Sequence, residues 1–201
     1  MKLLLLTACA ILTALTLRAA DADSPEVLAE QQLAAMRLGE WSTYAANMHP
    51  KALERLQKMM MPIVDAAGSG GEAAQLTATL FGGASGAQLK AMAPVKFFET
   101  LMSSMAKLPG ASEAMQSAEG TVLGKVLEGE NTAHVVTRMK MKISGVVDYS
   151  KLEVVSFEKD GGKWKGLLSG DMEMKFNQLM QRMAPQAAPK PPAKGAADTR
   201  R

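Results

Sequence analysis

The stretch of sequence that decides the fold is residues 132–143, TAHVVTRMKMKI, in which two kinds of side chain alternate. Successive side chains of a β-strand point to opposite faces, so this segment predicts a long strand with one packed face and one solvated face. Such a half-buried strand is typical of an antiparallel sheet. The packed set is Ala133, Val135, Thr137, Met139, Met141 and Ile143, and the solvated set is His134, Val136, Arg138, Lys140 and Lys142.

Further strands are expected on both sides of this segment. Residues 120–128 precede it across a turn at 129–131, and residues 150–159 follow it after a turn at 144–148. Asp160-Gly161-Gly162-Lys163 then predicts a hairpin into a fourth strand that ends near residues 169–171. A two-residue loop places opposite charges and apolar side chains across from each other. The expected pairs are Lys159 with Trp164, Glu158 with Lys165 and Phe157 with Gly166.

Helices are expected before and after these strands. Ser24, Pro25 and Glu26 are typical of a helix start, and Gly39 ends the apolar period that begins there. The chain order predicts the α+β class, with N-terminal helices packed on one face of a curved, four-stranded antiparallel sheet and a short C-terminal helix. The expected helices are residues 25–38, 40–48, 50–63, 72–81, 94–108 and 170–183, with glycine loops at 68–71 and 82–86.

The two ends of the chain differ in composition from its middle. Lys2 and the apolar run at residues 3–17 are typical of a secretory signal peptide, and the run is too short for a permanent membrane anchor. Small residues at Ala20 and Ala22 predict cleavage after Ala22, with cleavage after Ala20 as the alternative. Residues 184–201, rich in Ala, Pro and Lys, predict a disordered tail. The expected organisation is therefore a signal peptide at 1–22, one domain at 23–183, a tail, and export to the periplasm or the medium.

Composition excludes several classes of site. The chain has 47% apolar residues, enough for a packed core. Its single cysteine, Cys9, lies in the expected signal peptide, so the mature chain has no disulfide, Cys-ligated zinc or Cys nucleophile. Leu6-Thr7-Ala8-Cys9 resembles a lipoprotein box, but the apolar run continues well past Cys9 and favours ordinary cleavage. The net charge of +3 comes mainly from the tail, so no nucleic-acid partner is expected for the domain.

Two stretches carry a resemblance to a known family. The first is residues 34–50, with Gly39-Glu40-Trp41, Tyr44 and Met48-His49-Pro50, and the second is the strand series from Val122 to Leu168-Ser169-Gly170. On these the chain resembles the nuclear transport factor 2-like superfamily, the cone-shaped fold shared with ketosteroid isomerase, scytalone dehydratase and many exported bacterial domains. The resemblance covers most of residues 25–176, except that residues 68–108 predict helices where the family usually has a short strand or hairpin.

The resemblance implies a pocket between the concave sheet face and the first three helices. The concave face would be the one that carries Val135 and Met139, and this stretch offers no acid or base. Trp41 and Tyr44 would line the pocket mouth or, as the favoured alternative, serve as aromatic anchors in the core between helix and sheet. The candidate pocket residues are Trp41, Tyr44, Met48, Phe98, Val135, Met139, Met141 and Phe157. Relatives with this fold often dimerise through the outer sheet face, where the cationic side chains of Arg138, Lys140 and Lys142 would have to be neutralised.

The remaining titratable residues give weak catalytic signals. Glu153 shares a face with Val155 and Phe157, but it lies near the start of its strand, which favours exposure to solvent. His49 precedes a helix and His134 alternates outward, and neither has a carboxylate close in sequence, so a helix cap and a surface residue are expected. No catalytic residue, metal ligand or cofactor is predicted.

Three functions follow from this sequence. The first is an exported, non-enzymatic binding or accessory domain for a small apolar ligand or an envelope protein, with no stable membrane span and with homodimer formation as an option. The second, implied by the resemblance alone, is a lyase or isomerase of the ketosteroid isomerase type. The third is copper binding, because thioethers bind Cu(I) and the chain has 16 Met. Nearly all of these Met, however, fall where the helix or strand period requires a core residue.

Overall fold

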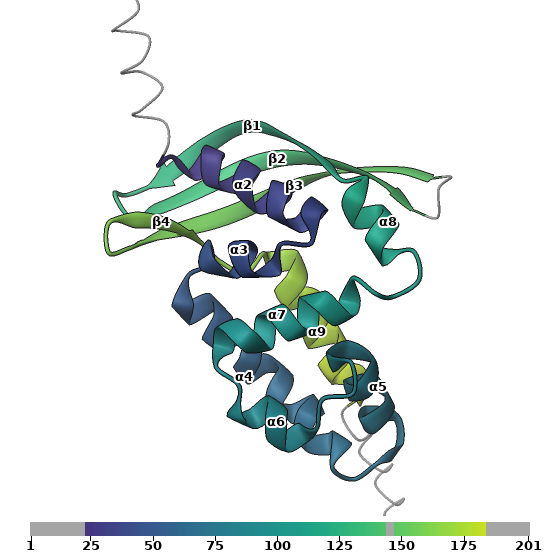
Figure 1. The fold of residues 1–201 in the computed structure, drawn as a ribbon. Coiled ribbons are helices and arrows are strands. Elements are labelled where there is room, and N and C mark those ends of the chain that lie inside the picture. Colours follow the sequence, from purple (N-terminus) through teal and green to yellow (C-terminus); the bar gives the residue numbers. More distant parts are fainter. Residues whose placement is uncertain (1–22, 144–146, 184–201) are drawn as a thin grey trace, which may run out of the picture.

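The computed structural model describes residues 23–143 and 147–183, which form a layer of helices beneath a curved sheet (Figure 1). This arrangement confirms the predicted α+β class. The expected signal peptide, the centre of the turn before residue 147 and the expected tail lie outside the described residues. The elements are α2 (Pro25–Leu38), α3 (Trp41–Ala46), α4 (Pro50–Ala67), α5 (Gly71–Phe81), α6 (Gly86–Ala91), α7 (Pro94–Met105), α8 (Ala111–Gln116), β1 (Glu119–Glu128), β2 (Thr132–Ile143), β3 (Val147–Asp160), β4 (Lys163–Gly166) and α9 (Gly170–Met183).

The sheet is an antiparallel meander in the order β1-β2-β3-β4. The predicted hairpin register is confirmed, since Lys159 lies opposite Trp164 and Glu158 opposite Lys165. Gly161 and Gly162 have φ angles of 58° and 82°, the left-handed conformation that a two-residue hairpin loop requires. The predicted faces of β2 are confirmed as well: Ala133, Val135 and Thr137 are buried under the helices.

Strand β4 is shorter than predicted. It ends at Gly166, which pairs with Phe157 of β3 on one side and bonds to the link between α3 and α4 on the other. The Gly166 N–H donates to the Asn47 carbonyl at 2.8 Å, and the His49 N–H donates to the Gly166 carbonyl at 2.8 Å. These bonds hold the end of the sheet against the helical layer.

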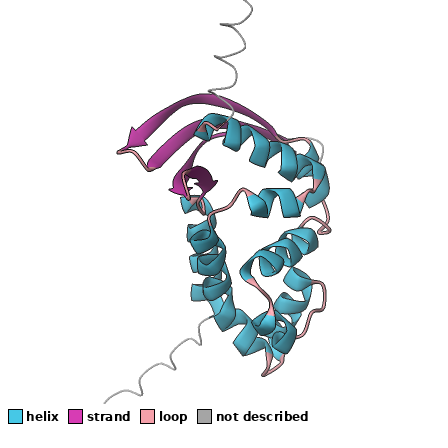
Figure 2. Cartoon of the chain, turned by 60° about the vertical axis from the view of Figure 1, so that its left-hand side comes forward, coloured by secondary structure: helices cyan, strands magenta, loops and turns pink. Residues whose placement is uncertain are grey.

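Helix α2 lies directly under the sheet (Figure 2). Its predicted start is confirmed, since the Ser24 side chain accepts a hydrogen bond from the Val27 N–H at 3.2 Å. Two glycines permit the close approach: a Cβ on Gly120 would collide with the Leu33 side chain, and one on Gly166 would collide with the Gln32 amide. The small core between α2 and the sheet consists of Leu28, Val135 and Phe157, with half-buried neighbours around it.

A second and larger core lies among α4, α5, α6, α7 and α9. Its fully buried side chains include Leu56, Met60, Phe97 and Leu101. The six-residue helices α6 and α8 were not predicted, because neither carries a run of apolar residues at helical spacing such as the Trp41 and Tyr44 pair of the equally short α3. The Ser85–Gln88 capping box at the start of α6 is a sequence signal that could have revealed the first of them. Within the described part of the chain, no helix is long and apolar enough to cross a membrane.

Candidate functional site

A cavity of about 190 Å³ lies between the small core under the sheet and the large helical core. Its walls come from α2, α3, α7, α9, the inner face of β1–β3 and the link that follows β4. The resemblance implied walls from the sheet and the first three helices, with Phe98 of α7 also named as a candidate; the structure adds α9. The lining residues are Ala29, Glu30, Gln32, Leu33, Met36, Tyr44, Met48, Phe98, Gly120, Val122, Thr137, Met139, Glu153, Val155, Leu167, Leu168, Ser169 and Met172.

Four of the candidate pocket residues line this cavity, namely Tyr44, Met48, Phe98 and Met139. The others lie elsewhere. Val135 and Phe157 are fully buried against Leu28, because α2 covers that part of the sheet and leaves no space above it.

Trp41 and Met141 are the remaining two candidates outside the cavity. Trp41 is 7% exposed and belongs to the core, where its ring lies 6.4 Å from that of Tyr44. Met141 is half-buried further along β2, beyond the cavity lining. The position of α2 on the sheet therefore decides which inward side chains reach open space.

Methionine side chains form much of the apolar wall. Met36, Met48, Met139 and Met172 come from four separate parts of the chain and meet at the cavity. Thioether side chains are flexible and polarisable, so a wall of this kind adapts to ligands of different shape. Met36 and Met172 were not predicted here, because their meeting depends on how α2 and α9 pack. The described residues contain no cluster of three His, Cys, Asp or Glu that could hold a metal ion.

Three polar residues of the lining already have hydrogen-bond partners, and one of them, Ser169, accepts from the Met172 N–H at 3.2 Å. The buried Gln32 amide donates to the Asn47 carbonyl at 3.4 Å and contacts the Met48 sulfur at 3.5 Å. The Thr137 hydroxyl donates to the Glu153 carbonyl at 3.4 Å. Sequence reasoning missed Gln32, whose only signal is its place one turn after Leu28 on the buried side of α2.

Tyr44 brings a neutral hydroxyl to the cavity. Its ring stacks on Phe98 with the ring centres 5.6 Å apart. Burial raises the pKa of Tyr44 to about 12, and the negative charge of Glu153 acts in the same direction. The phenol therefore stays protonated near neutral pH. None of the hydrogen bonds found among the described residues uses its hydroxyl.

Glu153 brings a carboxylate to the same cavity, which corrects the expectation that the concave face carries no acid. It lies on β3 opposite Thr137, and its side chain is 21% exposed. Lys151 lies 3.6 Å from this carboxylate but donates a much shorter bond, 2.6 Å, to Asp171. Burial alone would lower the pKa of Lys151, but the bond to Asp171 and the charge of Glu153 outweigh it and raise that pKa. Lys151 therefore stays charged.

The two histidines lie outside the cavity lining. His49 caps α4, since its Nδ1 accepts from the Lys51 N–H at 3.1 Å, which confirms the predicted cap. His134 lies on the outer face, 2.9 Å from the Ser156 hydroxyl and 3.0 Å from the Glu128 carboxylate. The pairing of β1 with β2 brings this carboxylate to His134, although the two residues are six positions apart in the sequence.

No protein-family model, no curated protein and no solved structure matches this chain. The cavity and the residues that line it are therefore the features from which a function is inferred.

Proposed function

We propose that this chain is an exported, non-enzymatic binding or accessory domain whose cavity takes a small apolar ligand. The observation that carries the proposal is the cavity of about 190 Å³ with its largely apolar, Met-rich lining. An apolar cavity of about 150 Å³ is enough to bind benzene, whereas sites for drug-sized ligands run from about 300 to 1,000 Å³. The ligand is therefore a single-ring molecule or one of similar size.

The state of Tyr44 supports a binding role over a catalytic one. A general acid or base works best when its pKa lies near the operating pH. The pKa of Tyr44, about 12, is far from that range. No hydrogen bond among the described residues joins it to Glu153, so the cavity has no assembled acid–base pair.

Binding of toluene, followed by NMR shifts and by the rise in melting temperature, tests this proposal. Ala29 lines the cavity from α2, and Ala29→Phe would fill it. Ala34 is exposed on the same helix, so Ala34→Phe is the matched control. We expect wild type and A34F to be stabilised by toluene and A29F to be unaffected, because only a folded state that binds the ligand is stabilised. Equal stabilisation of A29F would contradict the proposal.

Export is proposed from Lys2, the apolar run at residues 3–17 and the small residues around Ala22. A fusion of residues 1–22 to a reporter enzyme, expressed in a bacterial host, tests it. We expect the reporter in the periplasm or medium, with its N-terminus at the junction. Cytoplasmic retention of an intact fusion would contradict export.

A lyase or isomerase, as in the ketosteroid isomerase resemblance, is the second candidate. One observation favours it: Tyr44 and Glu153 line the same cavity. A carboxylate beside a neutral phenol could remove a proton next to a carbonyl that the phenol polarises. Deuterium exchange at the α-carbons of cyclohexanone, faster with wild type than with Glu153→Gln, would support this candidate. Equal rates for the two proteins would remove it.

Copper binding is the third candidate, and the four thioethers of the cavity wall are the observation in its favour. Thioether sulfur is a soft ligand that selects Cu(I). A Cu(I) titration of residues 23–201 against the Met48→Leu, Met139→Leu double variant decides it. Tight binding that the variant loses would support copper, and binding no tighter than micromolar would remove it.

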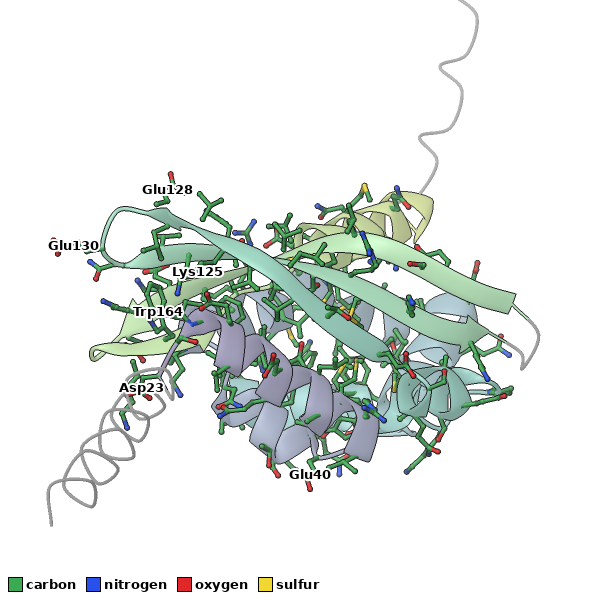
Figure 3. The ribbon with its side chains drawn as sticks, turned by 90° about the horizontal axis from the view of Figure 1, so that it is seen from above. Asp23, Glu40, Lys125, Glu128, Glu130 and Trp164 are labelled. Carbon is green, nitrogen blue, oxygen red and sulfur yellow. The ribbon has the colours of Figure 1, made fainter. Side chains whose placement is uncertain are left out.

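We propose a second copy of this chain as the partner of the outer sheet face. No described element covers that face, and Val126, Leu152 and Val154 on it are 62%, 62% and 51% exposed (Figure 1). The apolar row lies between two charged ends. Lys140 and Lys142 lie at one end, next to Arg138, which is opposite Leu152. Glu128 and Glu130 lie at the other end, beside the turn between β1 and β2 (Figure 3).

A two-fold symmetric pair would place each basic end over the acidic end of the other copy. This contact would neutralise the cations that argue against an apolar interface. In sedimentation experiments we expect dimers for wild type, monomers for Lys140→Glu, and dimers again when Glu128→Lys is added. Wild type that stays monomeric at high concentration would contradict the proposal.

A further inference from the structure

Tyr44 and Glu153 are two of the cavity-lining groups whose hydrogen-bonding capacity no described residue uses; a third, Glu30, is exposed on α2. The Tyr44 hydroxyl takes part in none of the hydrogen bonds found among the described residues, and its side chain is half-buried. The Glu153 carboxylate accepts no hydrogen bond there either, and its nearest cation is Lys151 at 3.6 Å. Gln32 and Thr137, in contrast, are bonded to backbone carbonyls. The free donor and the free acceptor thus face one space.

Tyr44 and Glu153 together restrict which polar group of a ligand can bind between them. None of the hydrogen bonds found among the described residues joins them, yet both line the same cavity, and the charge of Glu153 adds to the effect of burial in raising the pKa of Tyr44. A hydroxyl group can donate one hydrogen bond and accept others, so a single ligand hydroxyl can accept from Tyr44 and donate to Glu153. A ketone could only accept from Tyr44. An ammonium could only donate, which would leave the phenol proton without an acceptor.

The charges of the lining restrict the ligand further. Glu30 and Glu153 are acidic, and no Lys, Arg or His is among the lining residues. The neighbouring Lys151 is held by Asp171 at 2.6 Å. A ligand carboxylate would therefore enter a site that carries like charge and offers no cation, which is unfavourable.

We propose that the ligand is a neutral apolar alcohol whose hydroxyl accepts a hydrogen bond from Tyr44 and donates one to Glu153. Its ring lies against the Met-lined wall. This inference rests on the proposed binding function and names the class of ligand for the same cavity. The apolar wall selects size, and the Tyr44–Glu153 pair selects the polar group.

Four compounds with one carbon skeleton test the proposal by calorimetry: cyclohexylmethanol, methylcyclohexane, cyclohexanecarboxylate and cyclohexylmethylamine. We expect the alcohol to bind wild type most tightly and the carboxylate most weakly. Tyr44→Phe should lower the affinity for the alcohol about three- to tenfold, the usual effect of one neutral hydrogen bond, and leave the affinity for methylcyclohexane unchanged. Tyr149→Phe, which alters an exposed tyrosine outside the cavity, is the matched control.

Glu153→Gln gives an independent test, because it should change the binding of two of the compounds in opposite directions. Removing the charge of Glu153 should weaken binding of the alcohol but strengthen binding of the carboxylate, because the repulsion between like charges is gone. If Y44F does not fold, the preference of wild type for alcohol over hydrocarbon still decides the question.

The outcomes separate this inference from the proposed function. Equal binding of alcohol and hydrocarbon, with no effect of Y44F, would overturn the alcohol and indicate water between the two groups. Tightest binding of the amine would also overturn it. In both cases the cavity would still bind a ligand. Failure of all four compounds and of toluene would instead refute the binding function itself.

Discussion

At the scale of single residues, Tyr44 shows how position changes chemistry. Its ring packs between Trp41 and Phe98, and its hydroxyl borders a cavity that also holds a carboxylate. Burial opposes the charged form of the phenol, so its pKa rises to about 12. The same residue at an exposed position would ionise near its ordinary value of 10.

This shift predicts a loss of stability at high pH. Below pH 10 the phenol is neutral in both states, so its full contribution is present; between pH 10 and about 12 only the unfolded state releases the proton. The free energy of unfolding should therefore fall across this range, by roughly 2–3 kcal/mol. Urea unfolding as a function of pH, compared with Tyr44→Phe, measures this contribution.

The lysines also titrate at high pH, so the informative quantity is the difference between wild type and variant. Tyr149→Phe is the control, because Tyr149 is 40% exposed. A wild type whose stability follows the same pH curve as Y44F would show that Tyr44 is not shifted. Ultraviolet titration of the two tyrosines would give the same answer directly.

At the scale of elements, α2 determines the geometry of the site. It supplies one wall of the cavity, and it closes the part of the sheet that carries Val135 and Phe157. Its start depends on the Ser24 side chain, and its end on Gly39, which has a φ of 69°. Both signals are local, so they are visible in the sequence.

The cap of α2 gives a quantitative prediction. Ser24→Ala removes the acceptor for the Val27 N–H, so the free energy of unfolding should fall by about 1 kcal/mol. Ser24→Asp keeps an acceptor at this position and should retain the stability. Thermal unfolding of both variants is the measurement. If Ala and Asp behave alike, the hydrogen bond contributes nothing.

At the scale of the whole molecule, two cores of unequal size hold the fold. The large one lies among the helices and contains Leu56, which is 0% exposed. The small one fixes the sheet to α2. Because the cavity lies between them, ligand binding should stabilise their relative position.

A pair of substitutions tests where the stability lies. Leu56→Ala leaves a hole in the helical core and should cost about 2–5 kcal/mol. Val154→Ala, on the outer sheet face, should change the free energy of unfolding of the monomer by less than about 0.5 kcal/mol. Chemical unfolding at low protein concentration, where no dimer is present, compares the two. A large loss for V154A would show that the outer face contributes to the monomer itself.

The sequence by itself determined the class, the order of the elements apart from α6 and α8, and the hairpin register. Alternation along residues 132–143, the start at Ser24 and Pro25, and the Gly161-Gly162 loop are local signals, and local backbone preferences decide strands, caps and turns. It also provided four lining residues, because inward-facing side chains follow from periodicity. Only the tertiary structure decided which inward side chains meet open space. Packing between distant segments brings α2 into close contact with Gly120 and Gly166. It also places the side chains of Met172 and Glu153 at the cavity. No local pattern encodes such packing.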